Sequence, residues 1–339
     1  MNRSSHAATL LALCCGLAAA AAAAPRNTDV ISSPVYLEPQ QLVEVSDNRR
    51  MNLYCTGQGS PTVVFDSGLG DGMMVWAFVQ PLIAAEVRAC SYDRAGLGFS
   101  DPSPRPGTAA NIVDDLHLLL QAARIAPPYV LAGHSLGGMN IKLFAETYFP
   151  EVAGLVFVDP SHEDLTERSW ALDPPRAQRN AEFMRTLHRC LEAEPEQFIA
   201  GSELRRTCGT PPVADRLSPE IYALQFERTT RPGYMRAWIS ETDHVWTTSA
   251  EQLRAARRNL GDLPIVVLTH EPLPRRANES QAMSDAQNRV RAELHADIAG
   301  MSTRGVVRTV FDSGHYFQLD QPQDVAAAIL EVVDAVRAE

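Results

Sequence analysis

The segment Gly133-His134-Ser135-Leu136-Gly137 constrains this chain more than any other feature of its sequence. A short apolar run typical of a buried strand leads into it, and a helical pattern follows it from Met139. A strand that turns sharply into a helix holds the central serine in a strained conformation, with its hydroxyl exposed at the end of the sheet. The two outer glycines keep side chains out of the bend. We therefore interpret Ser135 as a nucleophile, and we assign His134 no catalytic role.

A serine hydroxyl is a weak nucleophile and needs a neighbouring base. The candidate is His315, which follows the last predicted strand and precedes the last predicted helix. Gly314 permits a tight loop that can return the imidazole to the end of the sheet. The remaining histidines beyond the leader lie in predicted helices or in and around an insertion, and we interpret them as packed or solvated: His117, His162, His188, His244, His270 and His295.

Short β-rich runs alternate with helical patterns, which predicts a mainly parallel sheet covered by helices. Thr108 is the expected N-cap of one helix, and Pro322 begins the last one. The predicted strands are Leu42–Ser46, Met51–Cys55, Thr62–Asp66, Val87–Tyr92, Tyr129–Gly133, Leu155–Asp159, Pro264–Leu268 and Val306–Phe311.

The segment between the sixth and seventh predicted strands contains no clear strand pattern. It holds three helical patterns, Arg176–Ala193, Pro219–Arg228 and Gly233–Leu260, separated by proline-rich turns. We predict a helical cap over residues 161–262, inserted between core segments 25–160 and 263–339.

Residues 1–24 resemble a signal peptide. Arg3 gives a positive start, an uncharged alanine-rich stretch with several leucines follows, and the small residues at its end suit a signal peptidase. The alternative is a weak membrane anchor. We expect export to the periplasm or the medium, and no later run is long and apolar enough to span a bilayer.

Export would place the cysteines in an oxidising compartment. The sequence has six, of which Cys14 and Cys15 lie in the leader. The remaining four, Cys55, Cys90, Cys190 and Cys208, predict two disulfides with three possible pairings. The absence of a C-x-x-C pair argues against a zinc site or a redox dithiol.

The formal net charge of −11 argues against a nucleic-acid partner and against anionic membranes. No tract of lysine and arginine interleaved with aromatic residues offsets it. We therefore predict no nucleic-acid role.

Four motifs together resemble the α/β-hydrolase superfamily: residues 66–70 (DSGLG), residues 92–101 (YDRAGLGFSD), the segment around Ser135, and Ser313-Gly314-His315. The resemblance covers Gln41 to Ala335, least well in the insertion. It implies an α/β-hydrolase fold with an eight-stranded, mostly parallel sheet and a triad in the order serine, acid, histidine. It also implies that Asp93, Arg94 and Asp101 hold a glycine-rich loop near the site.

The acid departs from the family pattern. Relatives commonly carry aspartate after the seventh strand, whereas this chain continues into His270-Glu271-Pro272. Some relatives place the acid after the sixth strand instead, where this chain has Asp159-Pro160. We prefer Asp159 over Glu271, and a turn residue is the alternative reading of Asp159.

The resemblance further implies an oxyanion hole of two backbone N–H groups. One belongs to Leu136 and the other to Leu69, flanked by Gly68, and each donor is worth on the order of 3 kcal/mol. Because the second and fourth strands are neighbours in this fold, the resemblance also implies disulfides Cys55–Cys90 and Cys190–Cys208.

The expected activity is hydrolysis of a small-molecule or lipid-like carboxylic ester through an acyl-enzyme, without metal or cofactor. The alternatives are amide or peptide hydrolysis of the prolyl-aminopeptidase type, acyl transfer, and a non-catalytic binding protein on the same scaffold. Epoxide hydrolase and haloalkane dehalogenase chemistry is disfavoured, because those relatives carry aspartate where this chain has Ser135.

Overall fold

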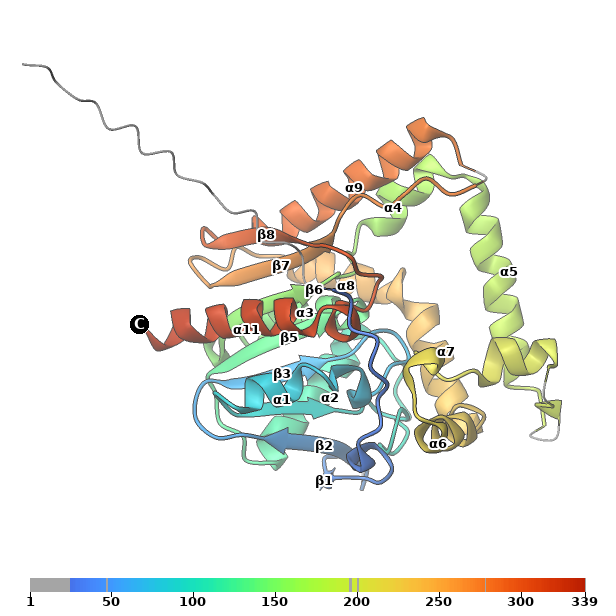
Figure 1. Ribbon diagram of the computed structural model, residues 1–339, viewed down its shortest axis with the longest axis horizontal. Coiled ribbons are helices and arrows are strands. Elements are labelled where there is room, and N and C mark those ends of the chain that lie inside the picture. Colours follow the sequence, from blue (N-terminus) through green and yellow to red (C-terminus); the bar gives the residue numbers. More distant parts are fainter. Residues whose placement is uncertain (1–24, 47, 195–196, 200, 278, 339) are drawn as a thin grey trace, which may run out of the picture.

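The computed structural model describes residues 25–46, 48–194, 197–199, 201–277 and 279–338. Its centre is an eight-stranded sheet with the order β1-β2-β4-β3-β5-β6-β7-β8 (Figure 1). Only β2 runs antiparallel to its neighbours; the other adjacent strands are parallel. The strands are β1 Gln41–Glu44, β2 Arg50–Thr56, β3 Thr62–Asp66, β4 Ala89–Tyr92, β5 Tyr129–His134, β6 Val152–Val158, β7 Ile265–His270 and β8 Gly305–Val310. The predicted fold class and all of the predicted strands are confirmed, with small shifts at their ends.

Helices cover both faces of the sheet because alternate strand residues point in opposite directions. On β7, Ile265 and Val267 belong to the core between the sheet and helices α2 (Ala109–Ala122) and α3 (Leu136–Thr147). Val266 and Leu268 pack in the opposite core, against α11 (Pro322–Arg337) and α1 (Gln80–Ala84). Helices α2 and α11 begin where the sequence predicts. The side chain of Thr108 accepts from Asn111 N at the start of α2, and Pro322 is the first residue of α11.

A helical insertion follows β6, as expected. Within its described residues lie α4 Leu165–Ser169, α5 Pro175–Cys190, α6 Pro219–Thr229, α7 Pro232–Val245 and α8 Thr248–Ala256, with short 3-10 or π turns between them. Figure 1 shows α5 at the outer edge of the molecule, between α4 at one end and the turns leading to α6 at the other. Helix α8 packs on α2 and α3 of the core layer, so it belongs to the core as much as to the insertion. The cap boundaries 161–262 therefore remain a prediction.

One helical expectation is wrong in detail: the pattern Gly233–Leu260 forms two helices rather than one. The break falls at Thr247, whose hydroxyl donates to the carbonyl of Asp243 at 2.9 Å. The backbone angles of Thr247, φ −121° and ψ −103°, lie outside the helical region and separate α7 from α8. Helix α9 (Gln281–Ala299), which was not among the predicted helices, lies between β7 and β8 and packs against α4.

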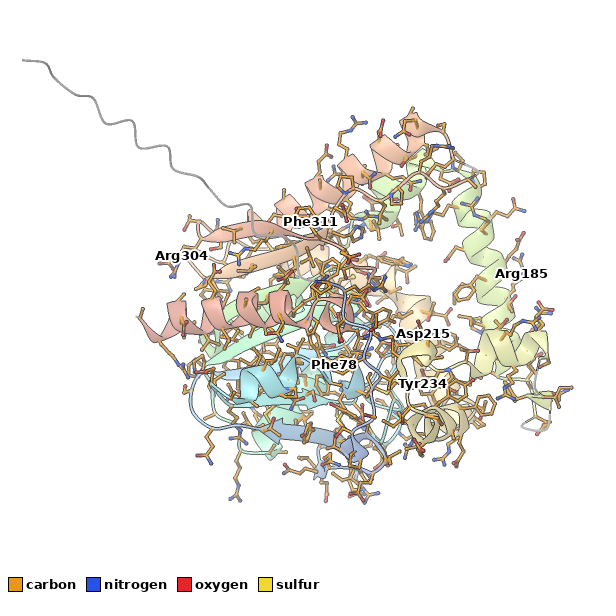
Figure 2. The ribbon with its side chains drawn as sticks, viewed as in Figure 1. Phe78, Arg185, Asp215, Tyr234, Arg304 and Phe311 are labelled. Atoms are coloured by element: carbon orange, nitrogen blue, oxygen red, sulfur yellow. A yellow bond between two sulfur atoms is a disulfide. The ribbon has the colours of Figure 1, made fainter. Side chains whose placement is uncertain are left out.

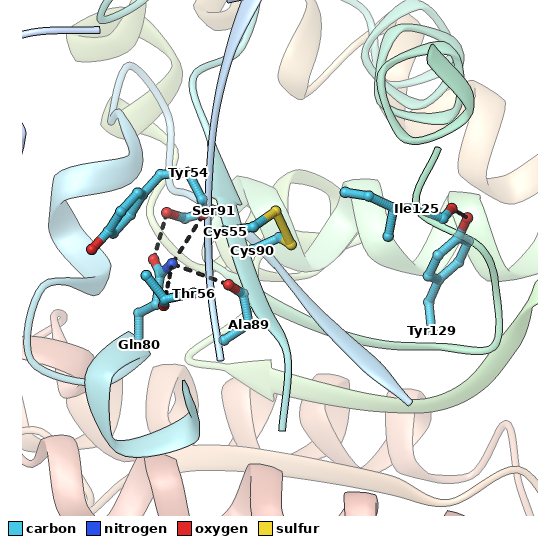
Figure 3. Close-up of a disulfide and its surroundings, with 9 residues drawn as sticks. All are labelled: Tyr54, Cys55, Thr56, Gln80, Ala89, Cys90, Ser91, Ile125 and Tyr129. Carbon is cyan, nitrogen blue, oxygen red and sulfur yellow. Dashed lines mark hydrogen bonds between the residues drawn. A yellow bond between two sulfur atoms is a disulfide. The ribbon is translucent and has the colours of Figure 1, made fainter. Parts of the chain in front are cut away.

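Two disulfides are present, with the pairing that the family resemblance implied: Cys55–Cys90 and Cys190–Cys208. Cys55 and Cys90 are directly opposed in the register of β2 and β4. Figure 3 shows Gln80 beside this bond, donating to the carbonyl of Tyr54 at 3.0 Å and accepting from the hydroxyl of Ser91 at 2.6 Å. The second disulfide joins the end of α5 to the turn at Arg205–Gly209.

None of the helices in the described residues has the length and apolar character needed to cross a bilayer. The predicted signal peptide, residues 1–24, lies outside the described residues.

Candidate active site

Ser135 stands at the bend between β5 and α3, with φ 52° and ψ −115°. A positive φ is unfavourable for a residue with a side chain, so the surrounding packing has to hold the bend. A Cβ at Gly133 would lie 2.4 Å from the carbonyl oxygen of Gly137, and a Cβ at Gly137 would lie 2.3 Å from that of Asp66. These two contacts give the steric reason for both outer glycines of the motif.

His315 lies in the loop between β8 and α10 (Phe317–Asp320), and its side chain is half exposed. Its Nδ1 is 2.6 Å from Oδ2 of Asp159, which follows the last residue of β6. An ionised carboxylate can only accept, so Nδ1 carries the hydrogen of this bond and Nε2 is the nitrogen left to accept a proton.

The loop of His315 rests on the bend of Ser135. The carbonyl oxygen of His315 is 2.9 Å from Nε2 of His134, and the two imidazole rings have centroids 4.6 Å apart. The bend is also tied to the loop after β6, because Ser161 N donates to the carbonyl of Ser135 at 2.9 Å. The candidate nucleophile, base and acid therefore come from the carboxyl ends of β5, β8 and β6.

Of the two candidate acids, the structure brings Asp159 to His315. Glu271 lies at the surface, where its Oε1 accepts from the backbone N–H of Asp312 at 3.4 Å. Burial alone would raise the pKa of Asp159, but hydrogen bonds from His270 and His315 and the charge of both rings hold it well below its ordinary value. Asp159 therefore stays ionised at neutral pH.

His270 is a neighbour of this pair that the sequence analysis interpreted as packed or solvated. Its Nε2 lies 3.4 Å from Oδ2 of Asp159, so two imidazoles face the same carboxylate oxygen. The position at the end of β7, where relatives carry their acid, was the signal in the sequence that could have pointed to it.

The expected oxyanion donors come from two separate segments, the start of α3 and the loop after β3. Leu136 is the first residue of α3, so its backbone N–H has no acceptor within the helix. Leu69 lies in the loop after β3, half-buried between Gly68 and Gly70. The N-terminal end of α3 adds the favourable dipole that developing negative charge needs.

A buried ionic network fixes that loop. Arg94 donates to the carbonyls of Ser67 at 2.7 Å and Gly68 at 2.6 Å, and to Oδ1 of Asp66 at 3.0 Å. Glu241 of α7 closes the network from the insertion: it accepts from Arg94 Nε at 2.7 Å and from Gly70 N at 3.0 Å. The loop that carries the candidate donor Leu69 is thus held by hydrogen bonds from Arg94 of the core and to Glu241 of the insertion.

The other two residues of the glycine-rich motif, Asp93 and Asp101, also accept from backbone groups. Asp93 accepts from the N–H groups of Met73 at 2.8 Å and Phe99 at 3.0 Å. Asp101 accepts from Arg50 N at 2.9 Å. These bonds hold the backbone of the loop, and they occupy both carboxylate oxygens of the buried Asp93.

A further buried carboxyl, Asp71, lies behind the loop. Its Oδ2 is 3.9 Å from Nδ1 of His134, and its Oδ1 accepts from the hydroxyl of Tyr316 at 3.4 Å. Burial raises the pKa of Asp71 to about 7, and burial together with the charge of His315 lowers the pKa of His134 to about 3. His134 is therefore neutral at physiological pH.

Within the described residues, no group of histidine, cysteine, aspartate and glutamate side chains is arranged to hold a metal ion. The site consists of a serine on a strained bend, a half-exposed imidazole bonded to a buried carboxylate, and backbone N–H groups beside them. A sequence profile described as the alpha/beta hydrolase family matches residues 63–328. The chain belongs to the α/β-hydrolase family.

Among curated relatives of this hydrolase, YqjL of Bacillus subtilis, an uncharacterized protein, is 24% identical over 277 residues, which cover 81% of this chain and 85% of YqjL. Two other curated relatives match over short segments only, and the chain spans 16% and 15% of their lengths.

Solved structures agree on the fold. A candidate epoxide hydrolase from Pseudomonas aeruginosa has a TM-score of 0.67 at 18% identity, covering 91% of this chain and 99% of its own. A thermophilic esterase from Thermogutta terrifontis has a TM-score of 0.57 at 19% identity, covering 88% of this chain and 99% of its own. At such identities the likeness concerns architecture alone, and the reaction has to be argued from this chain's own residues.

Proposed function

We propose that this α/β hydrolase is a serine hydrolase that cleaves carboxylic esters through an acyl-enzyme, with Ser135, His315 and Asp159 as its triad. The observation that carries the proposal is the 2.6 Å bond between His315 and the buried Asp159, in a loop that contacts the residue preceding Ser135, itself at a positive φ on a strand-to-helix bend. A structural serine would need neither the strained backbone nor the imidazole.

The reaction proceeds in two halves. Nε2 of His315 takes the hydroxyl proton of Ser135 as the oxygen attacks the ester carbonyl, and Asp159 stabilises the imidazolium that forms. The N–H groups of Leu136 and Leu69 stabilise the oxyanion of the tetrahedral intermediate. His315 then returns the proton to the leaving alcohol, and in the second half it activates the water that releases the acid.

Serine at position 135 also separates this proposal from the rival chemistries of the fold. Epoxide hydrolases and haloalkane dehalogenases of the family attack with a carboxylate at the bend, and here a hydroxyl occupies that place. Amide hydrolysis and acyl transfer would use the same three residues, so they remain alternatives that differ only in leaving group and acceptor.

Two measurements test the proposal. A fluorophosphonate probe should label the native protein at Ser135 and leave Ser135→Ala unlabelled, whereas a folded wild-type protein that resists the probe would favour a non-catalytic binding role. A panel of p-nitrophenyl esters of graded chain length, assayed beside aminoacyl-nitroanilides, should show turnover of esters. Cleavage of the anilides alone would refute ester specificity and keep the triad.

Export is proposed on two grounds: the signal-peptide pattern of residues 1–24 and two disulfides of the kind that persist in oxidising compartments. Expression of the full chain in a bacterial host, followed by fractionation and intact mass, tests it. Mature protein that lacks the leader should appear in the periplasm or the medium; full-length protein that stays in the cytoplasm would contradict export.

A further inference from the structure

Beside the His315–Asp159 pair lies a cavity of about 490 Å³. It is lined by the loop after β6, α4, the start of α5, the loop after β7, one side of α9 and the loop that carries His315. Asp159 and His315 of the proposed triad, together with His270, form part of its wall, so the cavity borders the base and the acid.

Three guanidinium groups line this cavity: Arg176 on α5, Arg276 in the loop before α9, and Arg291 on α9. Among the described residues that line it, the only carboxylate is that of Asp159, which already accepts from His315. The cavity is therefore positively charged in a chain whose net charge is −11. A local charge opposite to the overall charge calls for a specific cause.

Neighbouring arginines differ from these three in having carboxylate partners. Arg254 is 2.7 Å from Asp164, and Arg257 is 2.6 Å from Glu163. In the part of the chain that the structure describes, Arg176, Arg276 and Arg291 form no salt bridge to a carboxylate. The side-chain bonds that Arg176 and Arg291 do form include those to Ser169 Oγ at 3.5 Å and His270 Nδ1 at 3.4 Å, and neither partner is a carboxylate.

The three positive charges also repel one another. Burial and then the charge of Arg276 lower the pKa of Arg176. Burial also lowers the pKa of Arg291, and the charges of Arg276 and Arg176 add to this effect against the opposing charge of Asp159. Mutual repulsion of partly buried cations is a cost to folding unless an anion enters between them. A carboxylate, phosphate or sulfate group would satisfy the guanidinium donors, which match planar oxyanions well.

We infer that this cavity is an anion subsite, and that the substrate is an ester carrying a negatively charged oxyanion group that contacts Arg176, Arg276 and Arg291. The inference rests on the proposed ester hydrolysis and specifies its substrate class. Charge-assisted bonds of this kind correspond to a preference of about tenfold or more in kcat/KM over a neutral ester of the same size.

Matched ester pairs test the substrate preference. On the alcohol side, 4-acetoxybenzoate is compared with its methyl ester; on the acyl side, the mono-p-nitrophenyl ester of adipic acid is compared with p-nitrophenyl hexanoate. An acetate ester with a phosphate on the same ring distinguishes carboxylate from phosphate. The wild-type enzyme should favour the anionic member of at least one pair, and the preference should shrink with added salt.

The variants Arg176→Gln and Arg276→Gln should each reduce this preference severalfold or more, while Arg276→Lys retains most of it. Two matched controls should keep the wild-type ratio: Arg185→Gln, on the same helix as Arg176 but exposed at the outer edge of the molecule (Figure 2), and Arg275→Gln, beside Arg276 but outside the cavity wall. A preference that is absent, or that survives both cavity substitutions, would overturn the inference.

A second readout separates the subsite from the reaction. Calorimetric titration of Ser135→Ala with adipate should show binding that is lost with Arg276→Gln in the same background, and the neutral adipamide should not bind. Arginine-dependent binding of adipate in a protein that hydrolyses no ester would refute the proposed function and leave the subsite standing. Ester turnover with neither anion preference nor adipate binding would refute the subsite alone.

Discussion

Glu241 of α7 accepts hydrogen bonds from Arg94 of the glycine-rich loop with both carboxylate oxygens, at 2.7 Å from Nε and 2.9 Å from Nη2. Both side chains are almost completely buried. The same carboxylate accepts from Gly70 N, so one residue of the insertion fixes the loop that carries the proposed oxyanion donor Leu69.

The first prediction concerns this pair. Glu241→Gln removes one of the two carboxylates paired with the buried guanidinium of Arg94 and leaves Asp66, which should lower the free energy of unfolding by ~3 kcal/mol in urea denaturation. Loosening of the loop should also lower kcat more than it raises KM, because the oxyanion donors act in the transition state. Glu227→Gln, which breaks the exposed pair with Arg231, is the control and should cost at most about 1 kcal/mol. Equal losses in both variants would show that the buried pair has no special role.

The second prediction distinguishes the two candidate acids. Asp159→Asn should lower kcat by about 10³- to 10⁴-fold, because an amide cannot both fix the tautomer of His315 and stabilise its imidazolium. Glu271→Gln should change kcat by no more than about twofold, because Glu271 only accepts from the backbone of Asp312. Steady-state kinetics on the best p-nitrophenyl ester measures both, and the reverse ranking would move the acid to the end of β7.

The proposed triad and the Glu241–Arg94 pair differ in how far the sequence could predict them. Ser135 and His315 each lie in a short local pattern, where a few neighbouring residues determine the backbone, and the strands are compact apolar runs that fit only a buried sheet. Asp159 was preferred because a family member can carry its acid after the sixth strand. Nothing local identifies Glu241 as the partner of Arg94, because the two are 147 residues apart and meet only when the insertion folds onto the core.

The division between α7 and α8 was missed for a similar reason. Between Gly233 and Leu260 no proline or glycine interrupts the helical pattern, so periodicity alone predicts one helix. The available signal was the run Thr247-Thr248-Ser249, whose hydroxyls favour helix starts, and Thr247 does precede α8. The arginine cavity was equally hidden, since its three residues come from α5, from α9 and from the loop between β7 and α9.

The third prediction concerns pH. Burial raises the pKa of Asp71 to about 7, against about 3.9 for an unfolded chain, so the folded protein binds this proton more tightly. The associated stabilisation is complete below pH ~4 and is lost as the pH rises through about 7. Asp71→Asn, which imitates the protonated form, should therefore become more stable than wild type by ~2–4 kcal/mol between these limits.

Urea denaturation at pH 5, 6, 7 and 8 checks this expectation. The difference between Asp71→Asn and wild type should grow from pH 5 to pH 7 and then level off towards pH 8. Asp334→Asn, at an exposed position of α11, should run parallel to wild type. A constant difference between Asp71→Asn and wild type would mean that Asp71 is already ionised throughout.

The fourth prediction separates the two disulfides. Cys55–Cys90 spans 35 residues and joins two paired strands of the core sheet, whereas Cys190–Cys208 spans 18 residues within the insertion. Because a cross-link restricts the unfolded chain, Cys55→Ala with Cys90→Ala should lower the free energy of unfolding by ~3–4 kcal/mol. Loss of the second bond should leave the main urea transition closer to wild type and mainly speed proteolysis between α5 and α6, because the segment it closes lies outside the core sheet. If the second double variant shifted the main transition as far as the first, the insertion and the core would have to unfold as one cooperative unit.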